Sequence, residues 1–214
     1  LVQDEVGTVT GVEGERGGRQ ETVLARRGVV LASGGFEWDD ALREQHFPGP
    51  FDRIGSPRTN TGDGQHMAVR AGAALARMDQ ANVFATLPTR YEGEVHGMPT
   101  PFHAAAHAIL VNRAGERFVD EFDYNVGEAM DARDKASGAP AHLPCWMIAD
   151  QQFMRGAGVF RWYARTIPGW IRSASSVDEL SLAIDVPAPK LRDTLARYNG
   201  FVSEGQDADF HRGE

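Results

Sequence analysis

The sequence predicts an α/β segment followed by an α+β segment. Gly28–Ala32 is a short, continuously apolar run, which is typical of a strand covered on both faces, as in a parallel sheet. Pro88–Pro101, rich in proline and glycine, then changes the character of the chain and predicts an irregular crossing between domains. We therefore expect two domains, residues 1–84 and 85–214, without a core that runs through both.

The composition limits the classes of function. The chain has 214 residues, 42% hydrophobic and 24% charged, which is ordinary for a globular protein. A formal net charge of −8 argues against a nucleic-acid or anionic-membrane partner. The single cysteine, Cys145, excludes an intrachain disulfide and lies in an apolar run, so we expect a small buried side chain. No apolar stretch reaches the length of a membrane span and no signal-peptide pattern occurs, so we expect a cytoplasmic protein.

The first elements are expected in the order hairpin, buried strand and helix. Residues 7–12 and 21–25 are β-rich and flank a glycine-rich turn, which predicts a hairpin. The run Gly28–Ala32 ends in Ser33-Gly34-Gly35-Phe36, where two glycines would let a ligand approach the backbone. The alternative is a plain tight turn into a helix near Trp38.

A second glycine-rich segment follows the proline-rich connection His46–Pro50. Asn60-Thr61-Gly62-Asp63-Gly64 precedes an amphipathic, alanine-rich helix pattern that extends to about Leu75. A glycine-rich turn at a helix start leaves N–H groups free at the positive end of the helix dipole, a suitable place for a phosphate. Alternatively, Thr61 or Asp63 caps these N–H groups.

Three histidines, His96, His103 and His107, lie in and after the expected crossing. Their spacing fits no metal-ligand pattern, and no carboxylate is placed to complete a site. We therefore predict no metal site.

The stretch Ile109–Tyr124 predicts a second hairpin. Ala108–Val111 suits a buried strand, Asn112–Gly115 is turn chemistry, and Glu116–Val119 returns as a strand with alternating polarity. The hairpin would deliver Asp120, Glu121, Asp123 and Tyr124 to one end of a sheet. Its alternative is an ordinary surface loop.

Further elements follow from local patterns. We expect a short helix at Gly127–Arg133, a strand at Pro144–Asp150, a helix from Gln151, a helix Val177–Ile184 opened by a capping box at Ser176 and Glu179, and a helix Pro187–Val202. Trp162, Tyr163, Trp170 and Ile171 form an aromatic segment for core packing or for a lid over a flat apolar ligand.

Four segments together resemble one family. Val111–Glu121 is similar to the Val-Asn-x-x-Gly-x-Arg-Phe-x-Asn-Glu signature of the fumarate reductase and 3-ketosteroid dehydrogenase flavoprotein superfamily, although Asp120 stands where that family usually has Asn. Arg27–Phe36 and Asn60–Gly64 resemble its Ala-Thr-Gly-Gly-Phe and Thr-Gly-Asp-Gly segments, in the family's order. Residues 196–213 resemble a later segment, Arg-Phe-Asn-x-Phe and Gly-x-Asp-x-Asp-Phe-x-Arg-Gly.

The resemblance implies a fold and a cofactor. Residues 1–84 would be the remnant of a Rossmann-like FAD-binding domain and residues 85–214 an α+β cap domain. The family's N-terminal Gly-x-Gly-x-x-Gly motif is not in this sequence, and the first residue is Leu1, so we expect a fragment that lacks activity by itself. The expected FAD-binding residues are Ser33, Gly34, Gly35, Asn60, Thr61, Gly62, Asp63 and Gly64. We expect the two segments to lie close together, along one wall of the flavin site.

The resemblance also implies a reaction. Tyr124 would be the catalytic base that takes a proton beside a ketone, while the flavin takes a hydride from the next carbon. We expect its hydroxyl to face a cleft between the domains, toward Gly62–Gly64, on a loop anchored by buried Ile109, Val111 and Phe118. Glu121 would support that loop by accepting backbone hydrogen bonds.

The implied substrate is a small hydrophobic molecule such as a steroid, with an external electron acceptor. The alternative within flavoenzymes is a fumarate-reductase-like reaction on a dicarboxylate. Residues 133–137 resemble a segment of soluble fumarate reductases, and Arg155 falls near the place of their acid arginine. The alternative outside enzymes is a binding module without flavin.

Overall fold

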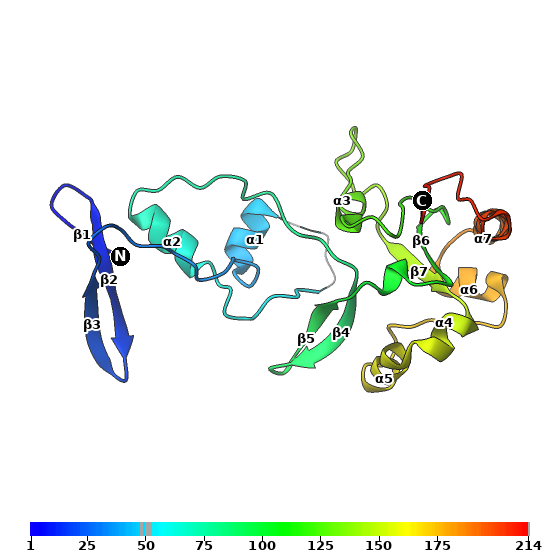
Figure 1. The fold of residues 1–214 in the computed structure, drawn as a ribbon, viewed down its shortest axis with the longest axis horizontal. Coiled ribbons are helices and arrows are strands. Elements are labelled where there is room, and N and C mark those ends of the chain that lie inside the picture. Colours follow the sequence, from blue (N-terminus) through cyan, green and yellow to red (C-terminus); the bar gives the residue numbers. More distant parts are fainter. Residues whose placement is uncertain (48, 50–52, 214) are drawn as a thin grey trace. The chain divides into compact units, whose positions relative to one another are not determined.

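The computed structural model describes residues 1–47, 49 and 53–213 and divides into two compact units. Unit 1 is Leu1–Ala81 and unit 2 is Asn82–Glu214 (Figure 1). In the expected proline-rich connection His46–Pro50, Pro48 and Pro50 lie outside the described residues.

Unit 1 contains a small antiparallel sheet and two short helices. The strands β1 (Val2–Gln3), β2 (Val9–Arg16) and β3 (Arg19–Leu24) lie in the order β1-β2-β3. Arg16 pairs with Arg19, so Gly17 and Gly18 form the turn, and the predicted hairpin is confirmed. The helices are α1 (Asp40–His46) and α2 (Asp63–Arg70).

The predicted buried strand Gly28–Ala32 does not form among the described residues. Residues 28–32 have no regular secondary structure, and Val30 is 90% exposed. A strand covered on both faces needs hydrogen-bonded neighbours. Among the described residues of unit 1, the one sheet is β1-β2-β3, and its register ends at Leu24, before this run. Residues 28–32 have the apolar composition of a buried strand, but the described residues of unit 1 include no strand that pairs with them.

Unit 2 begins with a hairpin where an irregular crossing was predicted, and this is a correction. Strand β4 (Thr86–Tyr91) pairs with β5 (Glu94–Pro99), and Tyr91 lies opposite Glu94. The two-residue turn Glu92-Gly93 has positive φ at both positions, which matches the twist of a hairpin. The prolines argued against strands in the sequence analysis. In a two-stranded sheet, however, both strands are edge strands, and an edge strand tolerates proline.

The second predicted hairpin is only partly correct. Strand β6 (Ala108–Asn112) forms as expected, and Gly115 N–H donates to Asn112 O at 2.9 Å in the predicted turn. Its partner, however, is β7 (Cys145–Ala149), and residues 116–119 keep one isolated bridge, Val111 with Arg117. The segment leaves the sheet because Arg117 turns inward to bind Glu121.

Four of the remaining helices of unit 2 were predicted: α3 (Val126–Met130), α4 (Gln151–Gly156), α6 (Val177–Ile184) and α7 (Ala188–Glu204). The short helix η1 (Phe102–Ala104) and the helix α5 (Gly158–Thr166), which carries Trp162 and Tyr163 of the aromatic segment, were not predicted. The predicted cap of α6 is confirmed, since Ser176 Oγ accepts a hydrogen bond from Glu179 N–H. Among the described residues, none of the helices combines the length and apolar character needed to span a bilayer.

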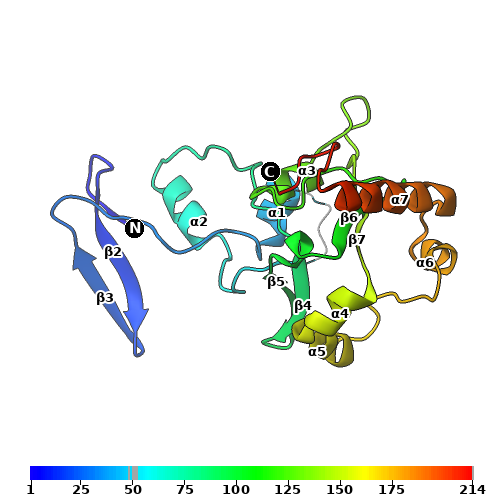
Figure 2. The ribbon, with the colours of Figure 1, turned by 45° about the vertical axis from the view of Figure 1, so that its right-hand side comes forward.

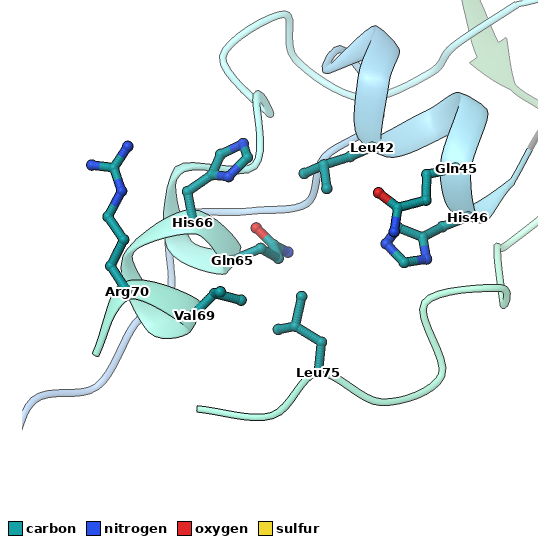
Figure 3. A pocket seen from close by; sticks show the side chains of 8 residues that line it. All are labelled: Leu42, Gln45, His46, Gln65, His66, Val69, Arg70 and Leu75. Atoms are coloured by element: carbon teal, nitrogen blue, oxygen red, sulfur yellow. The ribbon is translucent and has the colours of Figure 1, made fainter. Parts of the chain in front are cut away.

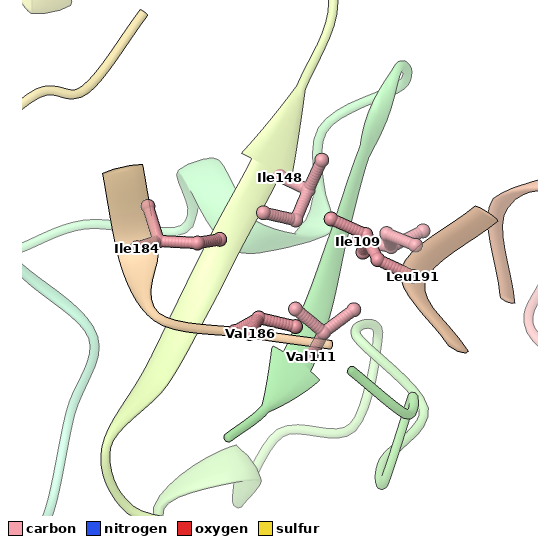
Figure 4. Close-up of a cluster of buried hydrophobic side chains, with 6 residues drawn as sticks. All are labelled: Ile109, Val111, Ile148, Ile184, Val186 and Leu191. Atoms are coloured by element: carbon pink, nitrogen blue, oxygen red, sulfur yellow. The ribbon is translucent and has the colours of Figure 1, made fainter. Parts of the chain in front are cut away.

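The apolar core of unit 2 forms around β6 and β7. Figure 4 shows Ile109 and Val111 of β6 and Ile148 of β7 facing Ile184 of α6 and Leu191 of α7. Figure 2 shows both helices beside this two-stranded sheet. The aromatic segment contributes a second cluster, in which Phe102, Phe153 and Phe160 meet edge to face, with Trp170 against them. Cys145 is half-buried.

Candidate functional site

The two glycine-rich segments of unit 1 are in direct contact, as predicted. Gly62 N–H donates to Gly35 O at 3.0 Å, and Trp38 N–H donates to Asn60 O at 3.0 Å. Ser33, Gly34 and Thr61 remain exposed. We call residues 33–35 and 60–64 the glycine platform.

Glycine makes this contact possible at two positions. Gly34 has φ +90°, and a Cβ there would lie 2.4 Å from Asn60 Oδ1. Gly62 has φ +76°, and a Cβ there would lie 2.6 Å from a methyl carbon of Leu42. Both positions therefore need the left-handed backbone that glycine adopts without strain, and a Cβ at either would displace the end of a neighbouring side chain.

Helix α2 starts directly from the platform. Gly62 is its N-cap residue and supplies no side-chain cap, and Thr61 Oγ1 lies 3.2 Å from Asp63 Oδ1. The alternative in which Thr61 or Asp63 caps the helix is therefore wrong for the described chain. The first-turn N–H groups are left for another acceptor, beside the exposed carboxylate of Asp63.

A hydrogen bond ties α2 to α1. His66 Nε2 lies 2.9 Å from Asp39 Oδ2, and Asp39 also accepts from Leu42 N–H as the N-cap of α1. The Leu42 N–H and then His66 lower the pKa of Asp39. A hollow of about 360 Å³ lies between the helices. Figure 3 shows Leu42, Val69 and Leu75 among the side chains that line it.

In unit 2, Tyr124 is at the tip of a loop and is fully exposed. Short local hydrogen bonds shape the loop: Asp120 Oδ1 accepts from Phe122 N–H at 2.9 Å, and Asp123 Oδ1 accepts from Asn125 N–H at 2.9 Å. Helix α3 follows with buried Val126 and with Gly127 tightly against the carbonyl of Val83. The phenol therefore projects from a loop whose two ends are fixed.

Two of the three expected anchors of this loop are buried. Ile109 and Val111 lie in the core, and Phe118 is only half-buried, where it stacks on His142 with ring centroids 4.5 Å apart. The role predicted for Glu121 as a backbone acceptor is confirmed, since Leu110 N–H donates to its carboxylate at 3.0 Å.

Sequence reasoning missed the charged residues around Glu121. Its fully buried carboxylate also binds Arg117 Nη2 at 2.7 Å and Arg212 Nη1 at 3.2 Å, and Arg117 Nη2 binds Asp207 Oδ2 at 2.9 Å. We call these four side chains the buried charge network. Arg117 and Glu121 are four residues apart, but Asp207 and Arg212 come from the other end of the unit, so no local signal connects them.

The network balances its charges. Burial alone would lower the pKa of Arg117, but Glu121 and Asp207 outweigh it and raise the pKa. Burial alone would raise the pKa of Asp207, but hydrogen bonds from Arg117 and from backbone N–H groups lower it. Two guanidinium groups thus face two carboxylates, the condition under which buried charges are tolerated.

The histidines of unit 2 serve other contacts. His107 Nδ1 lies 3.1 Å from Asp150 Oδ2, and burial lowers the pKa of His103. Within the described ranges, no group of three or more His, Cys, Asp or Glu side chains is arranged to hold a metal ion.

The chain mixes α and β elements, and the glycine platform lies at an uncapped helix start, where backbone N–H groups can hold polar groups of a ligand. Residues 1–214 match the FAD binding domain family, and the chain belongs to it. FAD is therefore the cofactor of its family.

The relatives named here are enzymes. The chain is 34% identical, over 99% of its length, to 4-oxocyclohexanecarboxylate 2-dehydrogenase of Sinomonas cyclohexanicum, of which it covers 37%. It is 30% identical, over 99% of its length, to a fumarate reductase (cytochrome) of Shewanella frigidimarina, of which it covers 35%. The chain thus spans little more than a third of these relatives.

A solved structure has a similar fold over nearly all of this chain. The 3-ketosteroid Δ1-dehydrogenase of Sterolibacterium denitrificans, in complex with 1,4-androstadiene-3,17-dione, superimposes with a TM-score of 0.75 at 29% identity. The match covers 96% of this chain and 39% of that one. The predicted membership of the fumarate reductase and 3-ketosteroid dehydrogenase superfamily is confirmed.

Proposed function

We propose that the gene product carrying these residues is an FAD-dependent dehydrogenase that introduces a carbon–carbon double bond beside a ketone. Residues 1–84 contribute to its FAD-binding domain, and residues 85–214 form the cap domain that presents Tyr124. The observation that carries the proposal is the exposed phenol of Tyr124. It has no packing role, yet its loop is braced at both ends, as proton transfer requires.

The glycine platform fits one part of FAD better than another. The uncapped start of α2 offers N–H donors, but the carboxylate of Asp63 stands beside them and would repel a phosphate. An uncharged polar edge, such as that of the flavin ring, suits this mixture of donors and acceptors. Ser33, Gly34, Gly35, Asn60, Thr61, Gly62, Asp63 and Gly64 would form that wall of the site.

The exposed run Gly28–Ala32 supports the assignment of a Rossmann-like remnant. Five apolar residues directly before the platform have the composition of a central strand and lack pairing partners among the described residues. In the whole protein this run would join a parallel sheet and carry the glycine platform at its carboxyl end.

In the reaction, bound FAD would accept the hydride that leaves one carbon of the substrate. Tyr124 would take the proton from the neighbouring carbon, the one beside the carbonyl. Its hydroxyl would face the glycine platform, where the flavin edge is expected. An external electron acceptor would complete the cycle.

Two relatives are named after substrates that have a structural feature in common. 4-Oxocyclohexanecarboxylate and a 3-ketosteroid each contain a six-membered ring with a ketone. We therefore propose a cyclic ketone as the substrate class, with a steroid as one member. A dicarboxylate reaction is the alternative that the fumarate reductase supports. Arg133, the first residue of the segment that resembles soluble fumarate reductases, is bound to Asp131 at 3.1 Å, whereas that reaction needs arginines that bind the carboxylates of the substrate.

The test uses the natural gene product with its flavin. We expect a flavin absorbance band and desaturation of 4-oxocyclohexanecarboxylate or of a 3-ketosteroid with an artificial electron acceptor. Tyr124→Phe should keep the band and lower kcat by about 10²- to 10⁴-fold. Tyr91→Phe is the matched control, because Tyr91 is another exposed tyrosine and its contact with His96 uses only the ring.

Three results would change the assignment. Full activity of Tyr124→Phe would remove Tyr124 from the chemistry. Turnover of fumarate without turnover of any cyclic ketone would favour the dicarboxylate reaction. A full-length protein that binds no flavin would favour a binding module.

A further inference from the structure

Arg212 is the most heavily constrained side chain of the buried charge network. Its Nη1 donates to Ala108 O at 2.7 Å and to Glu121 at 3.2 Å, and its Nη2 donates to Ala105 O at 2.9 Å. Its side chain is 6% exposed. These acceptors come from β6, from the end of η1 and from the loop after Arg117, so the plane of the guanidinium is fixed.

The guanidinium group of Arg212 lies over the aromatic ring of Phe122. The Cζ of Arg212 lies 5.0 Å from the centroid of the Phe122 ring, within the range of a cation–π contact. Phe122 follows the buried Glu121 and comes two residues before Tyr124. Its ring therefore connects the buried charge network to the exposed end of the loop.

Phe122 contributes little as a core residue. More than half of it is exposed, at 56%, so its burial does not explain an aromatic ring at this position. The side-chain hydrogen bonds of the loop itself are short-range and exposed: Phe122 N–H donates to Asp120, and Asn125 N–H donates to Asp123. Such turns define a local shape but leave the direction of the loop relative to the unit open. A contact to a fixed plane restricts that direction.

We propose that the stack of Arg212 on Phe122 positions the loop that presents Tyr124, which makes both of them positioning residues for proton abstraction. The inference rests on the proposed function. Proton transfer requires the donor and acceptor atoms within hydrogen-bond reach, and a displacement of about 1 Å can cost about 10²-fold in rate. An exposed ring can therefore affect the rate strongly and the stability weakly.

The experiment changes the ring and leaves the network intact. In the flavin-loaded natural gene product, Phe122→Leu keeps an apolar side chain but removes the face that Arg212 covers. We expect kcat to fall about tenfold, with KM within about twofold and with the flavin band and Tm unchanged. Phe122→Tyr keeps the ring face and should restore kcat.

Another stack in the same unit provides the matched control. Arg197 lies over the ring of Phe201, with its Cζ 4.9 Å from the centroid, and both residues belong to α7 and not to the Tyr124 loop. Phe201→Leu should leave kcat at the wild-type value. A fall in kcat equal to that of Phe122→Leu would overturn the proposal.

A double-mutant cycle distinguishes positioning from other effects. If Phe122 acts through Tyr124, Phe122→Leu should have no further effect on kcat in a Tyr124→Phe background. A multiplicative loss would overturn the proposal, because Phe122 would then act elsewhere. Wild-type kcat in Phe122→Leu alone would also overturn it, and so would loss of the flavin band or a lower Tm in that variant.

The two proposals can fail separately. If Tyr124→Phe loses activity and Phe122→Leu does not, the positioning role fails while the proposed function stands. A fully active Tyr124→Phe overturns both.

Discussion

Units 1 and 2 hold their functional segments by different means. In unit 1 the glycine platform is joined by backbone hydrogen bonds, and Gly34 and Gly62 have the left-handed conformation. In unit 2 the loop with Tyr124 follows four buried charged groups, one of which, Arg212, lies over the ring of Phe122 in the loop. Every fully buried apolar side chain among the described residues lies in unit 2, whereas the buried residues of unit 1 are glycines.

The difference shows which unit supplies its own core. Unit 2 encloses Ile109, Val111 and Leu191 between its own sheet and helices. Unit 1 leaves Val6, Val23 and Val30 exposed, although these are residues that a core normally takes up. We therefore expect the loop in unit 2 to depend on charge, and the platform in unit 1 to depend on backbone conformation.

The largest effect is expected from Glu121→Ala in unit 2. It would leave Arg117 and Arg212 buried and facing each other, so the free energy of unfolding should fall by about 3–5 kcal/mol. Urea unfolding followed by tryptophan fluorescence measures this, because three of the four tryptophans, Trp146, Trp162 and Trp170, lie in unit 2. Glu116→Ala is the control, since its partner Lys190 is in solvent, and we expect little change. Equal losses in the two variants would contradict a structural role for the buried charge network.

Asp207→Asn should have the next largest effect and a defined pH dependence. Its charge-assisted hydrogen bond to Arg117 contributes about 1.5–3 kcal/mol. Because the folded-state pKa of Asp207 is lowered, its contribution is present above its unfolded pKa of about 3.9 and is lost as the pH falls through the folded value. The variant should therefore be less stable at pH 7 and should lose less stability between about pH 5 and pH 2. Unfolding curves in that range measure it, and parallel pH profiles of the two proteins would be evidence against the pair.

Sequence reasoning succeeded where the deciding contacts are local. The hairpin at Gly17-Gly18, the cap at Ser176 and the contact between the glycine segments rest on turn chemistry or on a motif. It failed for Gly28–Ala32 and for residues 116–119, because a strand depends on distant partners, and β6 finds its partner in β7. No local sequence pattern indicated the buried charge network, since Arg117 and Asp207 are 90 positions apart.

A smaller effect is expected from Gly62→Ala in the glycine platform. Both the left-handed backbone and the contact with Leu42 oppose a Cβ, and the backbone alone costs about 1–2 kcal/mol. Gly72→Ala is the matched control, because Gly72 also has positive φ, +89°, but a Cβ there would meet nothing within 4 Å. Gly62→Ala should weaken FAD binding in the natural gene product, measured by flavin titration, and Gly72→Ala should not. Equal FAD affinity in both variants would mean that the glycine platform does not contribute to FAD binding.

The smallest effect is expected from Ser176→Ala at the start of α6. Ser176 Oγ accepts the N–H of Glu179 at 3.2 Å, and loss of such a cap typically costs about 1 kcal/mol. The cost stays small because the site is exposed and water can replace the acceptor, while Ile184 still holds the helix against the core. Ser176→Asp keeps an accepting oxygen at the positive end of the helix and should retain the stability. Urea unfolding of both variants measures the difference, and a loss in Ser176→Ala as large as that in Glu121→Ala would mean that exposed caps stabilise unit 2 as strongly as its buried charges do.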